Sequence, residues 1–193
     1  MKKKNLMFLI LGIAAVAVTG LALKDHLPGK GNRDPKVIGM NNKEASSGKG
    51  KGYETYTADF GDGYVMRFDY IPGLQELGTM EIGGVTVVDY GKGTTMLTAT
   101  HVAADINYTA AIPHTAEEYL GAGIDAEFCD ALPYKHGDAT GYAYWEKHEY
   151  SYGTGYTQGF NIFVGDEYFY IFVQQNDESG WPENIENVRI EKR

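Results

Sequence analysis

The stretch GYAYWEKHEYSYGTGYTQGFNIFVGDEYFYIFVQQ, residues 141–175, decides the fold. Glycine-containing turns at 153–155 and 165–166 divide it into three runs that are dense in Tyr, Phe and Trp. Within the first two runs, side chains of different character alternate with a period of two, which is typical of β-strands. Glycine tolerates the positive φ angles of tight turns, so each break suits a hairpin. The stretch therefore predicts a three-stranded antiparallel meander.

The first of these runs, 142–152, carries different chemistry on its two faces. One face holds Tyr144, Glu146, His148 and Tyr150. An aromatic, acidic and imidazole-bearing surface of this kind could bind a sugar or a cationic peptide, so these four residues are our candidate binding site. The alternative is a structural tyrosine ladder that covers a helix or faces solvent, in which Glu146 and His148 form a neutral pair.

The third run, 168–173, is apolar or aromatic at every position. A strand that is apolar on both faces is typical of the middle of a sheet that is covered on both sides. We therefore expect this run to lie centrally in the sheet and to contribute to the core.

Upstream of the meander, two glycine turns predict two further hairpins. These turns are Gly61-Asp62-Gly63 and Gly83-Gly84, each flanked by runs with strand character. A Thr-rich run with high β propensity follows the second hairpin. The strands that we expect in this part of the chain are 53–60, 64–70, 80–82, 85–90 and 95–102.

One helix is expected between these strands and the meander. Thr115 followed by Glu118 is a capping box, and apolar residues recur after it at helical spacing. We predict a helix over about 116–131. Gly121 and Gly123 each destabilise such a helix by about 1 kcal/mol relative to Ala, so the helix should depend on packing against the sheet.

Strands grouped around a single helix, rather than alternating with helices, indicate an α+β fold with a mainly antiparallel sheet. Near the C-terminus, Trp181-Pro182-Glu183 is followed by Ile185 and Val188. Proline suits the first turn of a helix, and the two apolar residues could dock a short final helix or strand. We expect one short C-terminal element there.

The order of these elements supports a family resemblance. Together with 142–145, Gly165-Asp166-Glu167 and the aromatic strand that follows, the order resembles the PsbP-like α/β/α sandwich and related extracytoplasmic domains of Gram-positive membrane proteins. The resemblance spans 53–193 and implies a non-catalytic binding or accessory module. The chain departs from the pattern at 176–187, which is too rich in Pro, Gly and acidic residues for the long final helix of such domains.

The N-terminal region predicts export. Lysines at positions 2–4 precede an uncharged apolar run, 6–23, as in a secretory signal. We expect 1–24 to be either a cleaved signal peptide or a retained membrane-anchor helix, and the leading lysines disfavour a buried core helix. Residues 25–52 are rich in Lys, Gly, Ser and Asn, which predicts a flexible linker before a single domain, 53–193. The domain is therefore expected outside the cytoplasm, secreted or tethered, with membrane contact at the N-terminus unless the signal is cleaved.

The charge of the domain disfavours one class of partner. Residues 53–193 contain 7 Lys and Arg against 23 Asp and Glu, a formal net charge of −16, whereas the whole chain has −9. Nucleic-acid binding depends on Lys and Arg that neutralise phosphates. We therefore expect no nucleic-acid partner.

Metal and nucleophile chemistry find little support in the sequence. No two histidines have the spacing of a zinc site, and Cys129 is the single cysteine. Cys129 falls in the predicted helix, where we expect a small buried hydrophobic side chain rather than a nucleophile. His101 could pair with Asp105 in a loop. Carboxylates in the turns at 59–63 and 176–178 could hold calcium, but neither matches an EF-hand loop, and acidic residues suit turns for backbone reasons alone. No metal or cofactor is expected.

These observations predict an exported, non-catalytic binding or accessory domain at the cell envelope, whose partner is an envelope protein or a glycan. Two alternatives stay open. An envelope hydrolase acting on glycan or peptide would need two carboxylates, or a histidine and a carboxylate, converging in a cleft. An acidic inhibitor or immunity-type protein would use its negative surface to block a basic partner.

Overall fold

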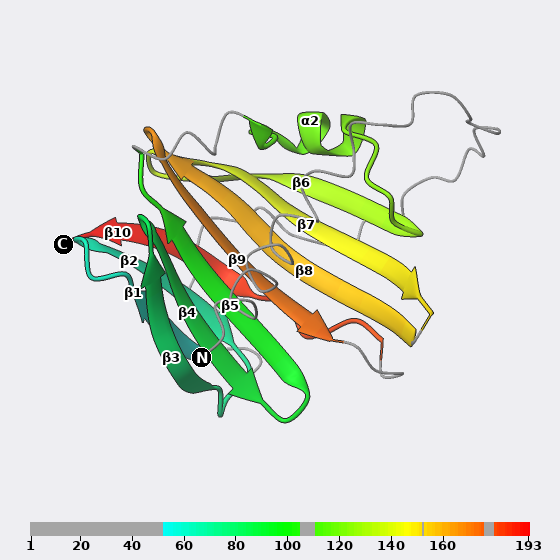
Figure 1. Ribbon diagram of the computed structural model, residues 1–193, viewed down its shortest axis with the longest axis horizontal. Coiled ribbons are helices and arrows are strands. Elements are labelled where there is room, and N and C mark those ends of the chain that lie inside the picture. The colour runs from blue at the N-terminus through cyan, green and yellow to red at the C-terminus, as the bar shows by residue number, and fades with distance from the viewer. Residues whose placement is uncertain (1–51, 105–110, 152, 176–179) are drawn as a thin grey trace, which may run out of the picture. The chain divides into compact units, whose positions relative to one another are not determined.

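The computed structural model describes residues 52–104, 111–151, 153–175 and 180–193, and this part of the chain folds into two antiparallel sheets (Figure 1). A large sheet has the strand order β3-β4-β5-β9-β8-β7-β6, and a small sheet has the order β1-β2-β10. The strands, in chain order, are β1 Glu54–Asp59, β2 Tyr64–Tyr70, β3 Gln75–Ile82, β4 Val85–Lys92, β5 Thr95–Val102, β6 Phe128–His136, β7 Ala139–Tyr150, β8 Gly153–Val164, β9 Glu167–Gln175 and β10 Glu186–Lys192.

The aromatic meander forms the middle and one side of the large sheet. Strands β7, β8 and β9 pair in sequence, as their alternation and glycine turns predict. Strand β9 is central, with three strands on each side of it. Its residues Phe169, Ile171 and Val173 are fully buried in the core between the sheets, whereas Tyr170 and Phe172 on its other face are only half-buried. The expected burial of both faces is therefore complete on one face and partial on the other.

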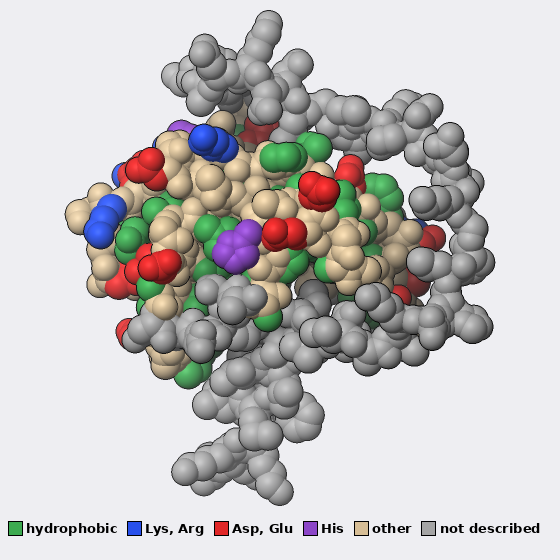
Figure 2. All heavy atoms as spheres, turned by 90° about the horizontal axis from the view of Figure 1, so that it is seen from above, with side chains coloured by type: hydrophobic (Ala, Val, Ile, Leu, Met, Phe, Trp, Pro, Cys, Tyr) green, Lys and Arg blue, Asp and Glu red, His purple; other side chains and the backbone are tan. Residues whose placement is uncertain are grey.

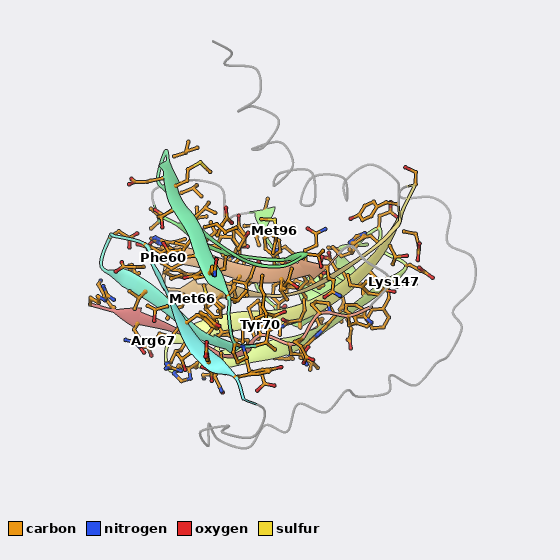
Figure 3. The ribbon with its side chains drawn as sticks, turned by 90° about the horizontal axis from the view of Figure 1, so that it is seen from below. Phe60, Met66, Arg67, Tyr70, Met96 and Lys147 are labelled. Atoms are coloured by element: carbon orange, nitrogen blue, oxygen red, sulfur yellow. The ribbon has the colours of Figure 1, made fainter. Side chains whose placement is uncertain are left out.

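The main core lies between the two sheets. The small sheet contributes Met66, Phe68 and Tyr70 from β2, which are buried, and the large sheet contributes the inner face of β9 together with residues of β4, β5, β7 and β8. Figure 3 shows Phe60, Met66 and Tyr70 in this region. The β1–β2 turn needs glycine, because Gly61 and Gly63 have φ angles of 77° and 92°. Both upstream hairpins are confirmed at their predicted turns.

The predicted helix over 116–131 is wrong beyond its first turns. Helix α2 spans Ala116–Gly121, and the Glu118 amide donates to the Thr115 hydroxyl as the capping box requires. Gly123 then has a φ angle of 71°, which a helix does not allow. From Phe128 onward the chain is β6, whose every residue pairs with β7, so Cys129 lies in an edge strand and not in a helix. Pairing with the edge of the meander outweighs the helical spacing of the apolar residues.

The fold is dominated by antiparallel sheet, and within the described ranges it contains one short α-helix. The C-terminal element is a strand, β10, which pairs with β2. The predicted signal or anchor helix at 1–24 and most of the linker at 25–52 lie outside the described residues. In the part of the chain that the structure describes, no helix is long and apolar enough to cross a membrane.

Candidate functional site

The candidate site lies on the outer face of the large sheet, the face turned away from the small sheet. Alternation along β7 sends Ala143 into the core between the sheets, whereas Tyr142 packs with helix α2 in a separate cluster. Figure 1 shows α2 lying beside β6 and β7. The ring centroid of Tyr119 in this helix lies 4.9 Å from the centroid of the Tyr142 ring and 5.5 Å from that of the Tyr144 ring. Helix α2 therefore covers one end of the predicted site.

Glu146 is the centre of the site and is buried, with 5% of its surface exposed. The Tyr119 hydroxyl donates a hydrogen bond to its Oε1, and His148 Nε2 lies 3.0 Å from its Oε2. Burial, and then the negative charge of Glu146, raise the pKa of Tyr119 far above its ordinary value, so the phenol keeps its proton and remains a donor. Both carboxylate oxygens are thus engaged within the protein.

Tyr144 is held flat against the sheet by a glycine on the neighbouring strand. Gly159 is its partner across β7 and β8. A Cβ atom at position 159 would lie 2.8 Å from two atoms of the Tyr144 ring and 2.6 Å from the Ile171 carbonyl oxygen. Only glycine at position 159 leaves room for the Tyr144 ring. The ring is half-buried, and burial raises the pKa of Tyr144 well above its ordinary value. Tyr144 is therefore a fixed, neutral part of the site.

The outward end of the site consists of His148 and Tyr150. Their rings stack with centroids 5.8 Å apart and an interplanar angle of 20°. Tyr150 is 38% exposed, and His148 is half-buried. The four predicted residues thus share one face, which we call the β7 face. Its inner end is the half-buried Tyr144 and the buried Glu146, and its outward end is the half-buried His148 and the exposed Tyr150.

Cys129 lies beside this site but is unsuited to nucleophilic catalysis. It sits opposite Glu146 across the β6–β7 pair and is half-buried. Burial raises the pKa of its thiol, and the negative charge of Glu146 acts in the same direction. Because the thiolate is the nucleophile, a protonated thiol reacts poorly.

A second cluster, which the sequence did not reveal, surrounds His101. The predicted partner Asp105 lies outside the described residues, and the imidazole instead contacts two carboxylates from distant parts of the chain. Its Nε2 lies 2.7 Å from Glu167 Oε2, and its Nδ1 contacts the Asp62 carboxylate. The ring is buried and stacks on Phe169 at 4.5 Å. The two ring nitrogens of His101 therefore link the β1–β2 turn, through Asp62, to Glu167 of the large sheet.

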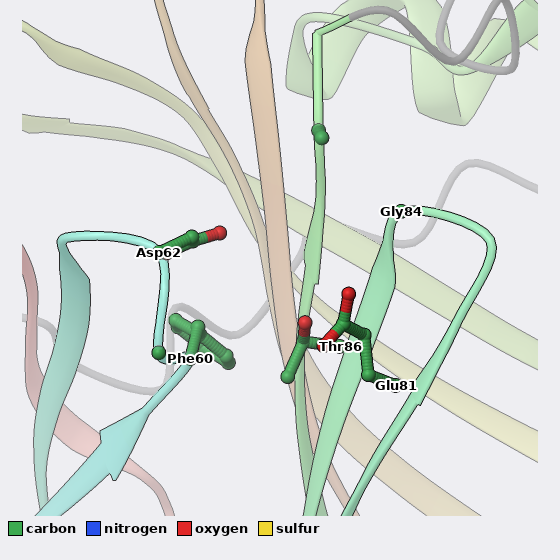
Figure 4. Close-up of a pocket in the computed structure, with 7 residues that line it drawn as sticks. Phe60, Asp62, Glu81, Gly84 and Thr86 are labelled. Atoms are coloured by element: carbon green, nitrogen blue, oxygen red, sulfur yellow. The ribbon is translucent and has the colours of Figure 1, made fainter.

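A hollow of about 240 Å³ lies next to this cluster and is lined by Phe60, Asp62, Glu81 and Thr86, among others (Figure 4). Glu81 lies on the exposed edge strand β3, while Asp62 is already paired with His101. Across 52–104, 111–151, 153–175 and 180–193, no group of three or more His, Cys, Asp or Glu side chains is placed to hold a metal ion. The cluster and its hollow are best explained as a junction between the sheets.

Compared with known proteins, the chain matches no family model and no curated protein sequence. The arrangement of its own residues therefore carries the functional argument.

Proposed function

We propose that the chain is an exported, non-catalytic binding domain that acts at the cell envelope through its β7 face. The observation that carries this proposal is the state of Glu146. The carboxylate is buried and both of its oxygens are engaged, by Tyr119 and by His148. Such a group orients His148 and does not serve as a free acid or base. The resemblance to PsbP-like extracytoplasmic domains also favours a module without catalysis.

The charge of the domain favours a cationic segment of an envelope protein as the partner. Most of the few basic side chains are already neutralised locally, as in the Arg67–Glu191, Arg193–Asp59 and Lys147–Glu127 pairs. The excess of acidic over basic side chains therefore gives the surface a net negative charge. Figure 2 shows acidic side chains scattered over one side of the molecule. A basic segment would be attracted by this field, and its aliphatic or aromatic parts could pack on the exposed ring of Tyr150.

Affinity capture from an envelope extract with the full chain tests this proposal. Tyr150→Ala and His148→Ala should each reduce recovery of the partner, and recovery by the wild type should fall as salt rises from about 0.05 to 0.5 M, because screening shortens the range of charge interactions. Met96→Ala removes an exposed apolar side chain from β5, three strands away from β7 in the large sheet, and is the control. Recovery that is insensitive to salt and unchanged in both β7-face variants would show that the proposal is wrong.

The same acidic surface favours a second candidate, an inhibitor or immunity-type protein that blocks a basic partner. The two candidates differ in consequence, because an inhibitor must suppress an activity of the protein that it captures. Adding the full chain to that captured protein separates them. Suppression that His148→Ala relieves would establish inhibition, whereas unaltered activity would leave an accessory binding domain.

A further inference from the structure

A second exposed aromatic surface lies on the inner face of the large sheet, at the end that carries the β7–β8 turn. Phe128, Lys147 and Tyr156 form one row across β6, β7 and β8. Trp181 packs edge-on between the two aromatic rings, 5.6 Å from Phe128 and 5.2 Å from Tyr156. Figure 3 shows Lys147 at the opposite end of the structure from Arg67 of β2. We call Phe128, Tyr156 and Trp181 the aromatic platform.

Two of the three platform rings are exposed, and Tyr156 is half-buried. Phe128 is 44% exposed and Trp181 is 40% exposed. The segment that carries Trp181 is nevertheless anchored, because Ile185 is fully buried and its amide donates to Gln158 Oε1 at 2.9 Å. Isolated apolar residues are common on protein surfaces, but Trp181 in contact with both Phe128 and Tyr156 forms a preorganised aromatic surface for a ligand.

Polar groups of both signs border the platform. Lys147 Nζ lies 2.7 Å from Glu127 Oε2 and 3.1 Å from Glu149 Oε1. Glu149 also accepts a hydrogen bond from the Thr154 hydroxyl. The hydrogen bond from Lys147, followed by that from Thr154, lowers the pKa of Glu149, so this carboxylate stays ionised at neutral pH. The border therefore offers fixed acceptors and an ammonium donor next to the rings.

We propose that the aromatic platform binds a glycan, specifically a β-linked chain of glucose-type pyranoses. The axial C–H groups of such sugars form flat apolar faces that stack on aromatic rings, and their hydroxyl groups both donate and accept, which suits Lys147, Glu127 and Glu149 together. An anionic polymer would meet the two carboxylates and a domain charge of −16. A wholly apolar partner would have to bury all three charged groups without replacing their water. This inference concerns a different face from the β7 face and does not rest on the function proposed for it.

The chain has two tryptophans, so the platform carries its own spectroscopic reporter. In the full chain with Trp145→Phe, Trp181 is the one remaining tryptophan. Titration with chitohexaose and with cellohexaose should shift its emission to shorter wavelength with saturation, because a stacked sugar displaces water from the indole. Unchanged emission with both sugars would overturn the proposal.

Variants then locate the site. Trp181→Ala should weaken binding of the responsive hexasaccharide by about tenfold or more, and Phe128→Ala severalfold, as for truncation of an aromatic anchor. Leu77→Ala, at an exposed site on β3, is the control and should bind as the wild type does. Thermal unfolding of each variant verifies that it is folded, and Trp181→Phe, which keeps an aromatic ring, should retain part of the affinity. Equal affinity of wild type and Trp181→Ala, loss in Tyr150→Ala instead, or Trp181-dependent binding of a lysine-rich peptide but of neither sugar would each overturn the inference.

Discussion

The hydrogen bond from Tyr119 to Glu146 can be removed with little change of shape by Tyr119→Phe. The phenyl ring would keep its contacts with Tyr142 and Tyr144, while Oε1 of the buried carboxylate would lose its donor. A hydrogen bond to a charged group contributes about 1.5–3 kcal/mol, and a neutral one about 0.5–1.5 kcal/mol. We therefore expect the free energy of unfolding to fall by about 2 kcal/mol.

Tyr134→Phe is the matched comparison, because it removes a neutral bond of 2.9 Å from the Tyr134 hydroxyl to the Val188 carbonyl oxygen. Its expected cost is about 1 kcal/mol. Urea denaturation, followed by circular dichroism, gives both free energies on the same scale. If Tyr119→Phe lowered the free energy of unfolding no more than Tyr134→Phe does, or raised it, the buried Glu146 carboxylate would not depend on Tyr119. Glu146 could then not be the fixed group that positions His148.

Three further predictions concern the stability of the same domain. His101→Gln should lower the free energy of unfolding by about 1.5–3 kcal/mol, because Asp62 and Glu167 lose their contacts with the ring and Phe169 loses its stacking partner, and denaturant titration measures it. Gly159→Ala should lower the free energy of unfolding by about 1–3 kcal/mol, because the added Cβ would force the Tyr144 ring off the sheet. The near-ultraviolet circular dichroism signal should change with it. Stability should fall above about pH 10, because unfolded tyrosines ionise there while burial raises the pKa of Tyr70 and of Tyr134 to about 12.

Each of these predictions has a contradicting outcome. Wild-type stability in His101→Gln would mean that the imidazole does not hold the two sheets together. An unchanged aromatic circular dichroism signal in Gly159→Ala would mean that Tyr144 does not need the glycine. For the pH series, the buried tyrosines keep their protons in the folded state, so each steepens the fall by about 1.4 kcal/mol per pH unit between the unfolded and folded pKa values. A flat stability curve from pH 10 to 11.5 would contradict their burial.

Local sequence signals predicted most of the strands because those signals act over a few residues, although β3 spans Gln75–Ile82 and not 80–82, and the start of β6 was assigned to the helix. The alternation in β7 and β8 and the glycine turns fix where the chain reverses, and the structure pairs these strands as expected. The helix was overextended for a related reason. Apolar residues recur at helical spacing from 116 to 128, but the chain from Phe128 onward pairs with the edge of β7, and that partner is not visible in the local pattern.

The arrangement of the four candidate residues on β7 was predicted in part. Alternation correctly placed Tyr144, Glu146, His148 and Tyr150 on one face of β7, but it could not show that Glu146 is buried while Tyr150 is exposed. That gradient depends on Tyr119, which arrives from a helix 27 residues earlier in the chain. Contacts between such distant residues follow from packing and not from spacing.

The same limit applies to the His101 cluster, where the imidazole pairs with a carboxylate 66 residues away. The sequence suggested the nearby Asp105 as its partner, because only short separations can be judged from spacing. Asp62 was recognised as a turn residue, which it is, but its contact with His101 requires the small sheet to pack on the large one.

The central claim is that the outward end of the β7 face, at His148 and Tyr150, contacts a cationic partner. The most direct test places a photo-crosslinking amino acid at position 150 of the full chain, with a second protein carrying it at position 96 as the control. In envelope extract, irradiation should give a discrete adduct from position 150 that weakens as salt increases, and none from position 96. No adduct from position 150, or the same adducts from both positions, would contradict the account.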